Sequence, residues 1–322
     1  MEHEKLVQAQ KIFGVPEQFF DVAQQMVQEV EWELILRMED RNIPDSKLRE
    51  IVLKERLTAD PYDFIKQCYS RAIIDKVPAE DGGELSWHIG SFYRRYSLYA
   101  QFEYYAYGKL PRQTIEALNQ WQFSEYLKIY GDDVRKKIQG IETHVHNSDF
   151  LTLEEAYAFV DKHADSVYLC ACNCKSQMYF HDRPICVCMN FYSGPNSEAD
   201  RGHAEKLTVE QAKAKLKEFN RKGLMQNGED YAICNCDGYC CYPLQMARAC
   251  GSQGIYPRSH YYIEWHPEEC ISCGRCVQIC NFNAFERDAD GKVHYVKDLC
   301  WGCTICAENC PKKAIHLIPK DK

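Results

Sequence analysis

The sequence predicts an α+β protein in several parts, and three observations support this prediction. The first half has apolar side chains at helical spacing and a single cysteine, Cys68. The other eighteen of the 19 cysteines lie after residue 169. Near the end of the sequence, one cysteine pattern occurs twice. We therefore expect a helical domain over 1–138, a linker over 139–151, a cysteine-rich domain over 152–261 and a further domain over 262–322.

Composition bounds the classes of function. A chain of 322 residues is long enough for two or three domains, and a net charge of −8 opposes binding to nucleic acid or to an anionic membrane surface. The start MEHEKLVQAQKIFGV lacks the features of an export signal, and no window is apolar enough to span a membrane. We expect a cytoplasmic protein. In that reducing compartment an odd, large number of cysteines indicates metal binding more than disulfides.

The first half begins with three expected helices. Residues 16–40 have apolar positions at helical spacing and predict one long amphipathic helix. Ser46 is the expected N-cap of the second helix, and Asp60 or Pro61 opens the third, PYDFIKQCYSRAII. Two short apolar runs around a Gly-Gly turn then predict a hairpin. Three helices followed by a hairpin is the order of a winged helix, so we expect a winged-helix-like N-terminal domain.

Further helices are expected on both sides of the polar segment 139–151. SFYRRYSLYAQFEYYAY and RQTIEALNQWQFSEYLKIY are two helical patterns separated by GKLP. Thr152, with Glu three residues later, predicts a capping box at the start of the next helix. Thr208 is the expected cap of a helix that ends at Gly223.

Two cysteine runs near the end of the chain are the most specific signal. They read Cys270-x2-Cys273-x2-Cys276-x3-Cys280 and Cys300-x2-Cys303-x2-Cys306-x3-Cys310-Pro311. This repeat resembles the bacterial two-cluster ferredoxin over about residues 262–320. The resemblance implies that three cysteines of each run share a cluster with the fourth cysteine of the other run. One [4Fe–4S] cluster would then be held by Cys270, Cys273, Cys276 and Cys310, and the other by Cys300, Cys303, Cys306 and Cys280.

The sequence around these runs adds three points. Gly274 and Gly302 lie inside the loops, where a missing Cβ permits close approach or positive φ. Asn281 stands where the pattern often has the proline that the second run has at Pro311. This departure removes no ligand. The alternative is a pair of zinc sites with four thiolates each, although zinc needs no interleaved fourth cysteine.

The middle domain carries ten cysteines in a different pattern, in which C-x-C recurs. In an extended backbone, residues two apart face the same side, so paired thiolates would project toward one centre. We expect one or two further [4Fe–4S] clusters here, with zinc or free thiols as alternatives. The candidate ligands are Cys170, Cys172, Cys174, Cys186, Cys188, Cys234, Cys236, Cys240 and Cys241. The adjacent Cys240 and Cys241 would face different centres or leave one free, and the role of Cys250 stays open.

A looser resemblance covers residues 165–262. The stretches CAC, ICVC and ICNCDGYCC resemble the cysteine-rich segment that precedes a two-cluster ferredoxin in larger iron–sulfur proteins of anaerobic microbes. That resemblance implies an iron–sulfur middle domain but no defined activity.

The remaining motifs mainly exclude classes of cofactor and enzyme. The sequence has no dinucleotide-binding glycine pattern after a strand, no Walker-type loop and no serine nucleophile elbow. We expect His144 and His146 to be solvated, and Cys68 to be a buried, inert thiol. His181 and His203 lie among the cysteines and are alternative cluster ligands, although the many thiols make them unnecessary.

The N-terminal domain is weakly basic for a DNA reader. Its third helix offers only Lys66 and Arg71, and residues 1–150 contain 19 basic against 25 acidic side chains. We therefore expect a module for protein docking or homodimerisation, with the tyrosine-rich helix in its core or interface.

These observations predict a multi-cluster iron–sulfur protein that transfers low-potential electrons to or from a reductase or dehydrogenase complex of an anaerobe. The alternatives are a redox-responsive regulator that uses the winged-helix-like domain, and a reductase whose catalytic cluster lies in the middle domain. We expect an electron-transfer subunit more than a stand-alone enzyme.

Overall fold

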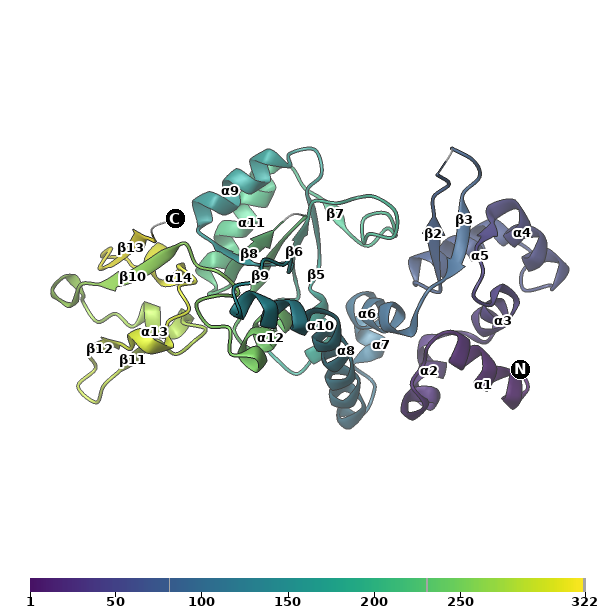
Figure 1. Ribbon diagram of the computed structural model, residues 1–322, viewed down its shortest axis with the longest axis horizontal. Helices are drawn as coiled ribbons and strands as arrows, with labels where there is room; N and C mark the ends of the chain where they lie inside the picture. The colour runs from purple at the N-terminus through teal and green to yellow at the C-terminus, as the bar shows by residue number, and fades with distance from the viewer. Residues whose placement is uncertain (81, 230, 321–322) are drawn as a thin grey trace. The chain divides into compact units, whose positions relative to one another are not determined.

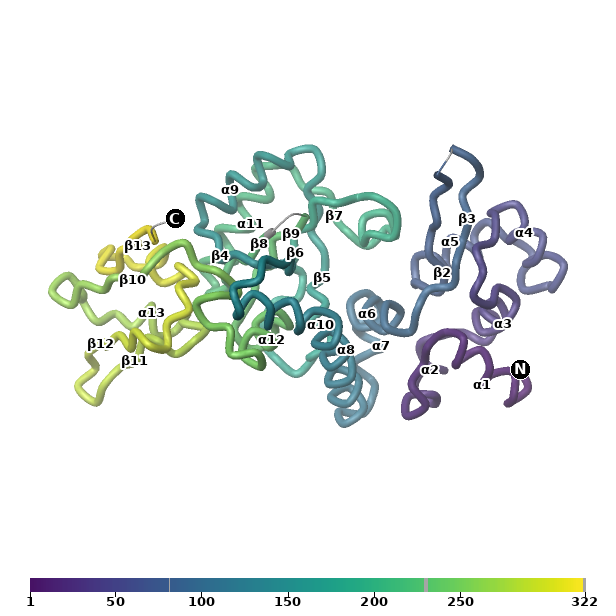
Figure 2. The backbone as a smooth tube through the Cα atoms, in the orientation of Figure 1, coloured from purple at the N-terminus to yellow at the C-terminus, as the bar shows by residue number. Residues whose placement is uncertain are grey.

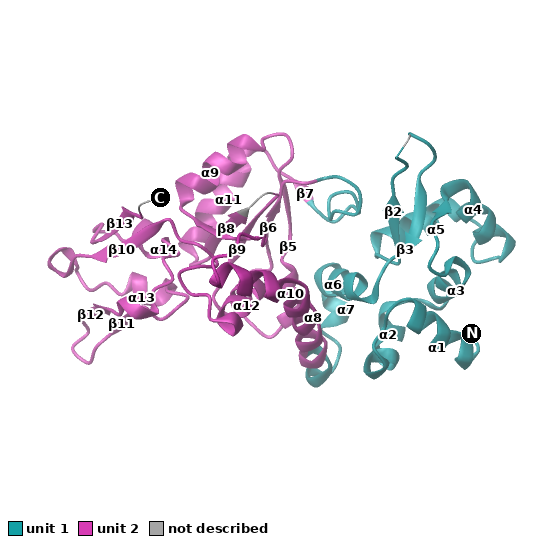
Figure 3. Cartoon of the chain, in the orientation of Figure 1, with its two compact units in different colours: residues 1–115, 193–204 teal, residues 116–192, 205–322 magenta. Residues whose placement is uncertain are grey.

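The computed structural model describes residues 1–80, 82–229 and 231–320, and it mixes helices and sheets as an α+β protein does. The chain forms two compact units (Figure 3). Unit 1 comprises residues 1–115 and 193–204, and unit 2 comprises residues 116–192 and 205–322. This division does not test the domain boundaries expected from the sequence, which stay a prediction. No helix among the described residues is both long and apolar enough to cross a membrane.

Unit 1 is mainly helical and carries one small sheet (Figure 1). Its antiparallel sheet has the order β1-β3-β2, with Lys76 of β2 opposite Trp87 of β3. Asp60 caps α5 as expected, because its carboxylate accepts hydrogen bonds from the amides of Tyr62 and Asp63. The elements are α1 His3–Ile12, η1 Glu17–Phe19, α2 Phe20–Met26, α3 Glu29–Met38, β1 Ile43–Pro44, α4 Asp45–Lys54, α5 Pro61–Ser70, β2 Ile74–Val77, β3 Ser86–Ile89, α6 Phe92–Phe102 and α7 Tyr104–Tyr107.

The prediction of a single helix over residues 16–40 is wrong. The chain forms η1, α2 and α3 there, and it breaks at Val27, whose φ of −125° and ψ of 128° are extended. The amide of Gln28 donates a 2.7 Å hydrogen bond to the Glu31 carboxylate, which caps α3. Apolar periodicity continues across this break because Val27 is itself buried, so spacing alone does not reveal it.

A network of charged side chains lies inside unit 1, with Glu31 and Arg95 buried and Arg71 and Glu103 partly exposed. Arg71, at the end of α5, donates to Glu31 at 2.7 Å and to Glu103 at 3.0 Å. The fully buried Arg95 also donates to Glu103, at 2.5 Å, and to the Met26 carbonyl. Every one of these charges therefore has a partner of opposite sign within the unit.

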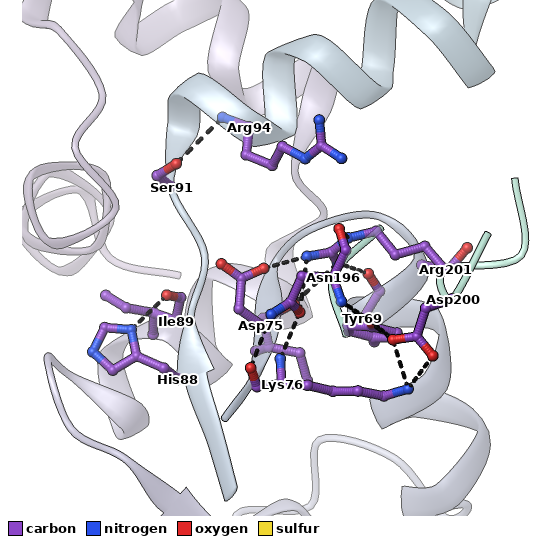
Figure 4. Close-up of polar contacts among 12 residues, drawn as sticks. Tyr69, Asp75, Lys76, His88, Ile89, Ser91, Arg94, Asn196, Asp200 and Arg201 are labelled. Carbon is purple, nitrogen blue, oxygen red and sulfur yellow. Dashed lines mark hydrogen bonds and ion pairs between the residues drawn. The ribbon is translucent and has the colours of Figure 1, made fainter. Parts of the chain in front are cut away.

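The segment 193–204 leaves unit 2 after β6 and belongs to unit 1 (Figure 4). Its Arg201 is 4% exposed and donates to the carbonyls of Tyr69 and Ile74 and to the Asp75 carboxylate. The Asn196 side-chain amide donates to the Lys76 carbonyl at 2.9 Å, and the Asp200 carboxylate accepts from the Lys76 ammonium at 2.7 Å. These contacts fasten the segment to the end of α5 and to β2.

Replacing Arg201 with methionine is expected to destabilise unit 1 by about 3 kcal/mol, because two carbonyls and a carboxylate lose their common donor. Native-state hydrogen exchange of α5 and β2 measures this as a lower free energy of opening. Arg41→Met is the control, since the Arg41 side chain is 61% exposed and the free energy should stay within ~0.5 kcal/mol. Unchanged exchange in Arg201→Met would contradict the assigned role.

Unit 2 contains a six-stranded antiparallel sheet of order β4-β8-β9-β6-β5-β7. Helices α9 and α11 pack on one face through Val160 and Leu216, and α12 with the end of α8 lies against a second core (Figure 1). The elements are α8 Arg112–Ile138, which begins in unit 1, β4 Asp149–Leu151, α9 Leu153–Lys162, β5 Tyr168–Ala171, α10 Asn173–Met178, β6 Cys186–Asn190, β7 Glu205–Lys206, α11 Val209–Arg221, β8 Met225–Glu229, β9 Ala232–Cys236 and α12 Tyr242–Cys250.

The expected caps of this sheet's helices are confirmed. Thr152 and Glu155 form the capping box of α9, and Thr208 caps α11, which is followed by Gly223 at φ +86°. The segment 139–151, expected as a linker, ends as the edge strand β4, in which Phe150 is fully buried.

The end of the chain repeats one arrangement with an offset of thirty residues (Figure 2). In each half a 3₁₀ turn, a short helix and a strand follow one another: η2 Pro267–Glu269, α13 Arg275–Ile279 and β11 Phe285–Arg287, then η3 Lys297–Leu299, α14 Ile305–Glu308 and β13 Ile315–Pro319. Strand β10 Tyr261–Trp265 pairs with β13, and β12 Val293–Tyr295 pairs with β11. The buried core is small: Ile263, Phe285, Val293, Cys306 and Ile315.

Candidate metal centres

The first C-terminal set of cysteines comes from both runs. Cys270, Cys273 and Cys276 of the first run and Cys310 of the second line one cavity. Burial raises the pKa of Cys276 to about 11. The four thiols therefore lie together, and a bound metal would supply the positive charge that thiolates need there.

The second C-terminal set also combines the two runs. Burial raises the pKa of Cys303 and Cys306, and both feel the charge of Cys280 and Cys300. Cys280, from the first run, therefore lies next to the three cysteines of the second run. Four soft thiolates in each set suit iron–sulfur clusters, although the assignment of each ligand stays a prediction.

The ligand loops have matching backbones. Positive φ occurs at Ser272 (50°) and Gly274 (76°), and thirty residues later at Gly302 (73°) and Thr304 (65°). The amides of Ser272 and Gly302 donate to the sulfurs of Cys270 and Cys300 at 3.4 and 3.3 Å. The positive φ expected at both glycines is confirmed. Amides that point at sulfur stabilise negative charge on it.

Six cysteines of the middle region converge, and we call them the six-thiol site. Hydrogen bonds between sulfurs link them in the order 174–172–188–234–236–241, and Cys241 also acts electrostatically on Cys174. They come from the start of α10, from β6, from β9 and from the residue before α12. The members are Cys172, Cys174, Cys188, Cys234, Cys236 and Cys241.

The remaining middle cysteines lie outside this set. The β5–β6 register shifts, so Cys170 lies opposite Cys188 while the next residue, Ala171, lies opposite Cys186. The shift turns Cys186 outward, where it is exposed near Glu205 and Lys215. The sulfur of Cys170 instead accepts a 3.4 Å contact from Asn190.

Cys240 and Cys250 have other surroundings. The thiol of Cys240 is buried against Asp237, and Cys250 at the end of α12 lies 3.9 Å from the Gly131 carbonyl. Cys241 is linked to the row through Cys236, whereas Cys240 lies against Asp237 and is affected by the charges of Cys172 and Lys175. As ligands, Cys170, Cys186 and Cys240 stay predictions.

The six-thiol site has a strongly polar surround. Hydrogen bonds from Cys174 and Cys188 lower the pKa of Cys172, and hydrogen bonds from Cys188 and Cys236 lower that of Cys234. Lys175 is 1% exposed; burial opposes its charge, but neighbouring Cys172, Cys236 and Asp237 raise its pKa. Its ammonium donates to the Asn235 carbonyl at 2.7 Å. A buried cation therefore accompanies a group of thiolates.

Two further donors reach the sulfurs directly. The Asn147 side-chain amide donates to Cys234 at 3.1 Å, and the Tyr242 amide donates to Cys174 at 3.4 Å. Asn147, Lys175 and Asp237 lie outside every ligand pattern, so the sequence does not identify them.

The candidate histidines form hydrogen bonds with residues other than the cysteines. His146 is not solvated as expected: its ring accepts or donates a 2.6 Å hydrogen bond with Tyr126, and burial lowers its pKa. His181 bonds to the Lys175 carbonyl, and His203 bonds to Ser70 and stacks on Phe102 in unit 1. Cys68 is fully buried, as expected.

The six-thiol site consists of sulfur donors, which suit soft metals. Among the residues that the structure describes, no three His, Cys, Asp or Glu side chains form a site for one metal ion. The thiols instead extend as a row of six, and soft thiolates with amide donors around them are typical of iron–sulfur centres.

Comparison with known proteins is informative only for the end of the chain. Residues 264–317 match the family model described as a 4Fe-4S dicluster domain. The chain is 34% identical over 55 residues to the pyruvate synthase subunit PorD of Methanocaldococcus jannaschii, and 36% identical over 55 residues to that of Thermotoga maritima. It is 44% identical over 46 residues to a ferredoxin of Pyrobaculum islandicum.

These matches are short. They cover 17%, 17% and 14% of this chain and 64%, 56% and 43% of the respective relatives. No solved structure matches the chain significantly. The comparisons therefore describe the C-terminal segment alone.

Proposed function

Because the chain carries a C-terminal two-cluster ferredoxin domain, we propose that the whole protein is a multi-cluster iron–sulfur electron carrier. In this proposal Cys270, Cys273, Cys276 and Cys310 hold one [4Fe–4S] cluster, and Cys280, Cys300, Cys303 and Cys306 hold the other. Such clusters accept and donate single electrons at low potential. The residues of the chain fix the thiolates, exclude water and direct amides at sulfur.

We propose that the six-thiol site holds one further [4Fe–4S] cluster. The observation that carries this proposal is the convergence of Cys172, Cys188, Cys234 and their neighbours in a buried row, with the Lys175 ammonium beside it. Four thiolates suffice for one such cluster, and six are too few for two separate ones with four ligands each. The alternative of two clusters would require ligands from outside the row.

The winged-helix-like part of unit 1 is proposed as a protein-docking module. The order α3, β1, α4, α5, β2, β3 and the sheet order β1-β3-β2 support the likeness. On α5, Arg71 is used in ion pairs with Glu31 and Glu103, which leaves the exposed Lys66 as the basic side chain for a phosphate. Binding to DNA by this helix would have little electrostatic support.

The partner is proposed to be an oxidoreductase complex of an anaerobe. Two of the relatives are named as subunits of pyruvate synthase, and they share the ferredoxin segment with this chain. A ferredoxin domain in unit 2 together with a docking module in unit 1 would let the chain deliver electrons to such a complex.

Metal analysis tests the proposal. Protein purified without oxygen is expected to contain about twelve iron and twelve acid-labile sulfide per chain, four of each per cluster, and little zinc. About eight of each would mean that only the ferredoxin domain is loaded, and the six-thiol proposal would fail. Zinc bound at the six-thiol site would appear in the same sample as about one or two zinc ions per chain.

A gel-shift experiment separates the carrier from a regulator. The fully loaded protein is expected to leave random duplex DNA unretarded at ~50 mM salt, where phosphate contacts are strong. The same assay after air oxidation tests the redox-responsive alternative. Retardation in either state that weakens as salt rises would favour the regulator.

A further inference from the structure

The six-thiol site and the second C-terminal set share one apolar core within unit 2. Cys236 and Cys241 of the six-thiol site and Cys303 of the second set are members of the same buried cluster. Cys174, Cys234 and Cys280 pack against it. The two groups of thiols therefore contact one continuous apolar core.

The first C-terminal set lies farther from that core. Cys270, Cys276 and Cys310 pack against the separate small core of the ferredoxin domain. Cys273 is exposed, and the adjacent Ile271 is 57% exposed. Cys276 still acts electrostatically on Cys306, so the two C-terminal sets are neighbours. The three sites thus have an order: an exposed first set, a second set beside it, and the six-thiol site beyond.

One residue joins the second set to the six-thiol site. Asn281 directly follows Cys280, and its side-chain oxygen accepts a 3.0 Å hydrogen bond from the Gly238 amide. Gly238 lies two residues after Cys236. A path therefore runs from Cys280 through Asn281, Gly238 and Asp237 to Cys236. It is covalent except for the hydrogen bond between Asn281 and Gly238.

The junction is closely packed on both sides. A Cβ at Gly238 would lie 2.2 Å from the Asn281 carbonyl oxygen, so only glycine permits this approach. The Asn281 side-chain nitrogen donates to the Gly223 carbonyl at 3.0 Å, and Arg248 donates to the carbonyls of Gly238 and Asn281. The amide side chain of Asn281 is thus held from both ends.

The internal repeat shows what is particular about this position. Thirty residues on, Pro311 follows Cys310 in the equivalent place and is exposed. Proline has no side-chain amide with which to make the two hydrogen bonds of Asn281. The two cysteine runs therefore differ at the residue through which the first run contacts Gly238.

We propose, on the basis of the function proposed above, that Asn281 is a positioning residue for electron transfer between the ferredoxin domain and the six-thiol site. Clusters held by the second set and by the six-thiol site would exchange one electron in either direction, with no bond formed or broken and no proton moved. The exposed first set is the end at which an external redox protein exchanges electrons.

Substitution of Asn281 tests this in the full-length, anaerobically loaded protein. Asn281→Leu removes both hydrogen bonds at similar size, and Asn281→Asp restores an oxygen acceptor for the Gly238 amide. Gln278→Leu is the matched control, because Gln278 is exposed nearby and its side chain takes no part in the junction. Iron content, midpoint potentials, hydrogen exchange of residues 236–241 and the stopped-flow rate of reduction by dithionite are measured for each.

Asn281→Leu is expected to keep the wild-type iron content and potentials, while protection of the 236–241 amides falls about fivefold or more, the factor that corresponds to ~1 kcal/mol. Reduction of the ferredoxin clusters keeps its rate, and reduction of the six-thiol site slows several-fold. Asn281→Asp recovers part of the rate, and Gln278→Leu matches wild type.

Two outcomes overturn the inference in different ways. A wild-type rate and wild-type protection in Asn281→Leu, with all clusters present, would refute the junction while leaving the carrier intact. About eight iron in the wild type would remove the proposed third cluster itself, and the junction with it. If Asn281→Leu loses iron, Asn281→Asp is used in its place. At full iron content, the six-thiol site of Asn281→Asp must be reduced more slowly than that of the wild type, and a wild-type rate would overturn the proposal.

Discussion

Removal of iron from the intact protein with a chelator is expected to unfold residues 262–320 while unit 1 stays folded. The core that belongs to residues 262–320 alone has five buried residues, one of which is Cys306, while Phe282 and Trp301 pack on a core shared with the rest of unit 2. A segment of this size rarely folds on such a core without a metal. Burial also raises the pKa of Cys303 and Cys306, so without metal the segment must bury neutral thiols or unpaired charge.

Hydrogen exchange measures this expected result directly. Amides of β10, β11, β12 and β13 should lose protection together, because metal binding and folding are one equilibrium in small metal domains. Amides of α5 and β2 in unit 1 are the internal control, since no cysteine ligand is proposed there. Retained protection of β10 and β13 after complete loss of iron would show that the apolar core is sufficient by itself.

Replacing Cys172 and Cys234 together with alanine is expected to remove the third cluster completely. These two thiols each accept hydrogen bonds from two neighbouring cysteines, so they occupy central positions in the row of six. Iron and sulfide should fall from about twelve to about eight per chain. The electron paramagnetic resonance signals of the ferredoxin domain should persist.

Cys186→Ala is the matched control for that variant. Cys186 lies on the same strand as Cys188 but is exposed and outside the row. Its loss should leave the iron content unchanged. If Cys186→Ala loses as much iron as the double variant, the ligand set differs from the row seen here.

The sequence predicted some elements well because their signals are local. The caps at Asp60, Thr152 and Thr208 and the positive φ at Gly274 and Gly302 depend on residues within a few positions of each other. The ferredoxin resemblance also implies the grouping of the two C-terminal sets, because both cysteine runs keep its spacing.

The middle site was predicted only in part, because long-range pairing decides it. The C-x-C rule works for Cys234 and Cys236, which lie in the regular strand β9. It fails for Cys186 and Cys188, where the β5–β6 register shift turns one of the two away. Nothing in the local sequence marks that shift. The contacts of Asn147 and Asp237 likewise depend on residues distant in the chain.

The placement of residues 193–204 in unit 1 affects the order in which the protein can mature on the ribosome. Domains usually fold as they emerge, the N-terminal one first. Here Arg201 supplies contacts to Tyr69, Ile74 and Asp75, so unit 1 is incomplete until residue 204 has been synthesised. By then Cys172, Cys174 and Cys188 have been synthesised, and their remaining partners have not. The nascent chain therefore contains thiols of the six-thiol site before unit 1 can be complete, so these thiols are open to oxidation during synthesis.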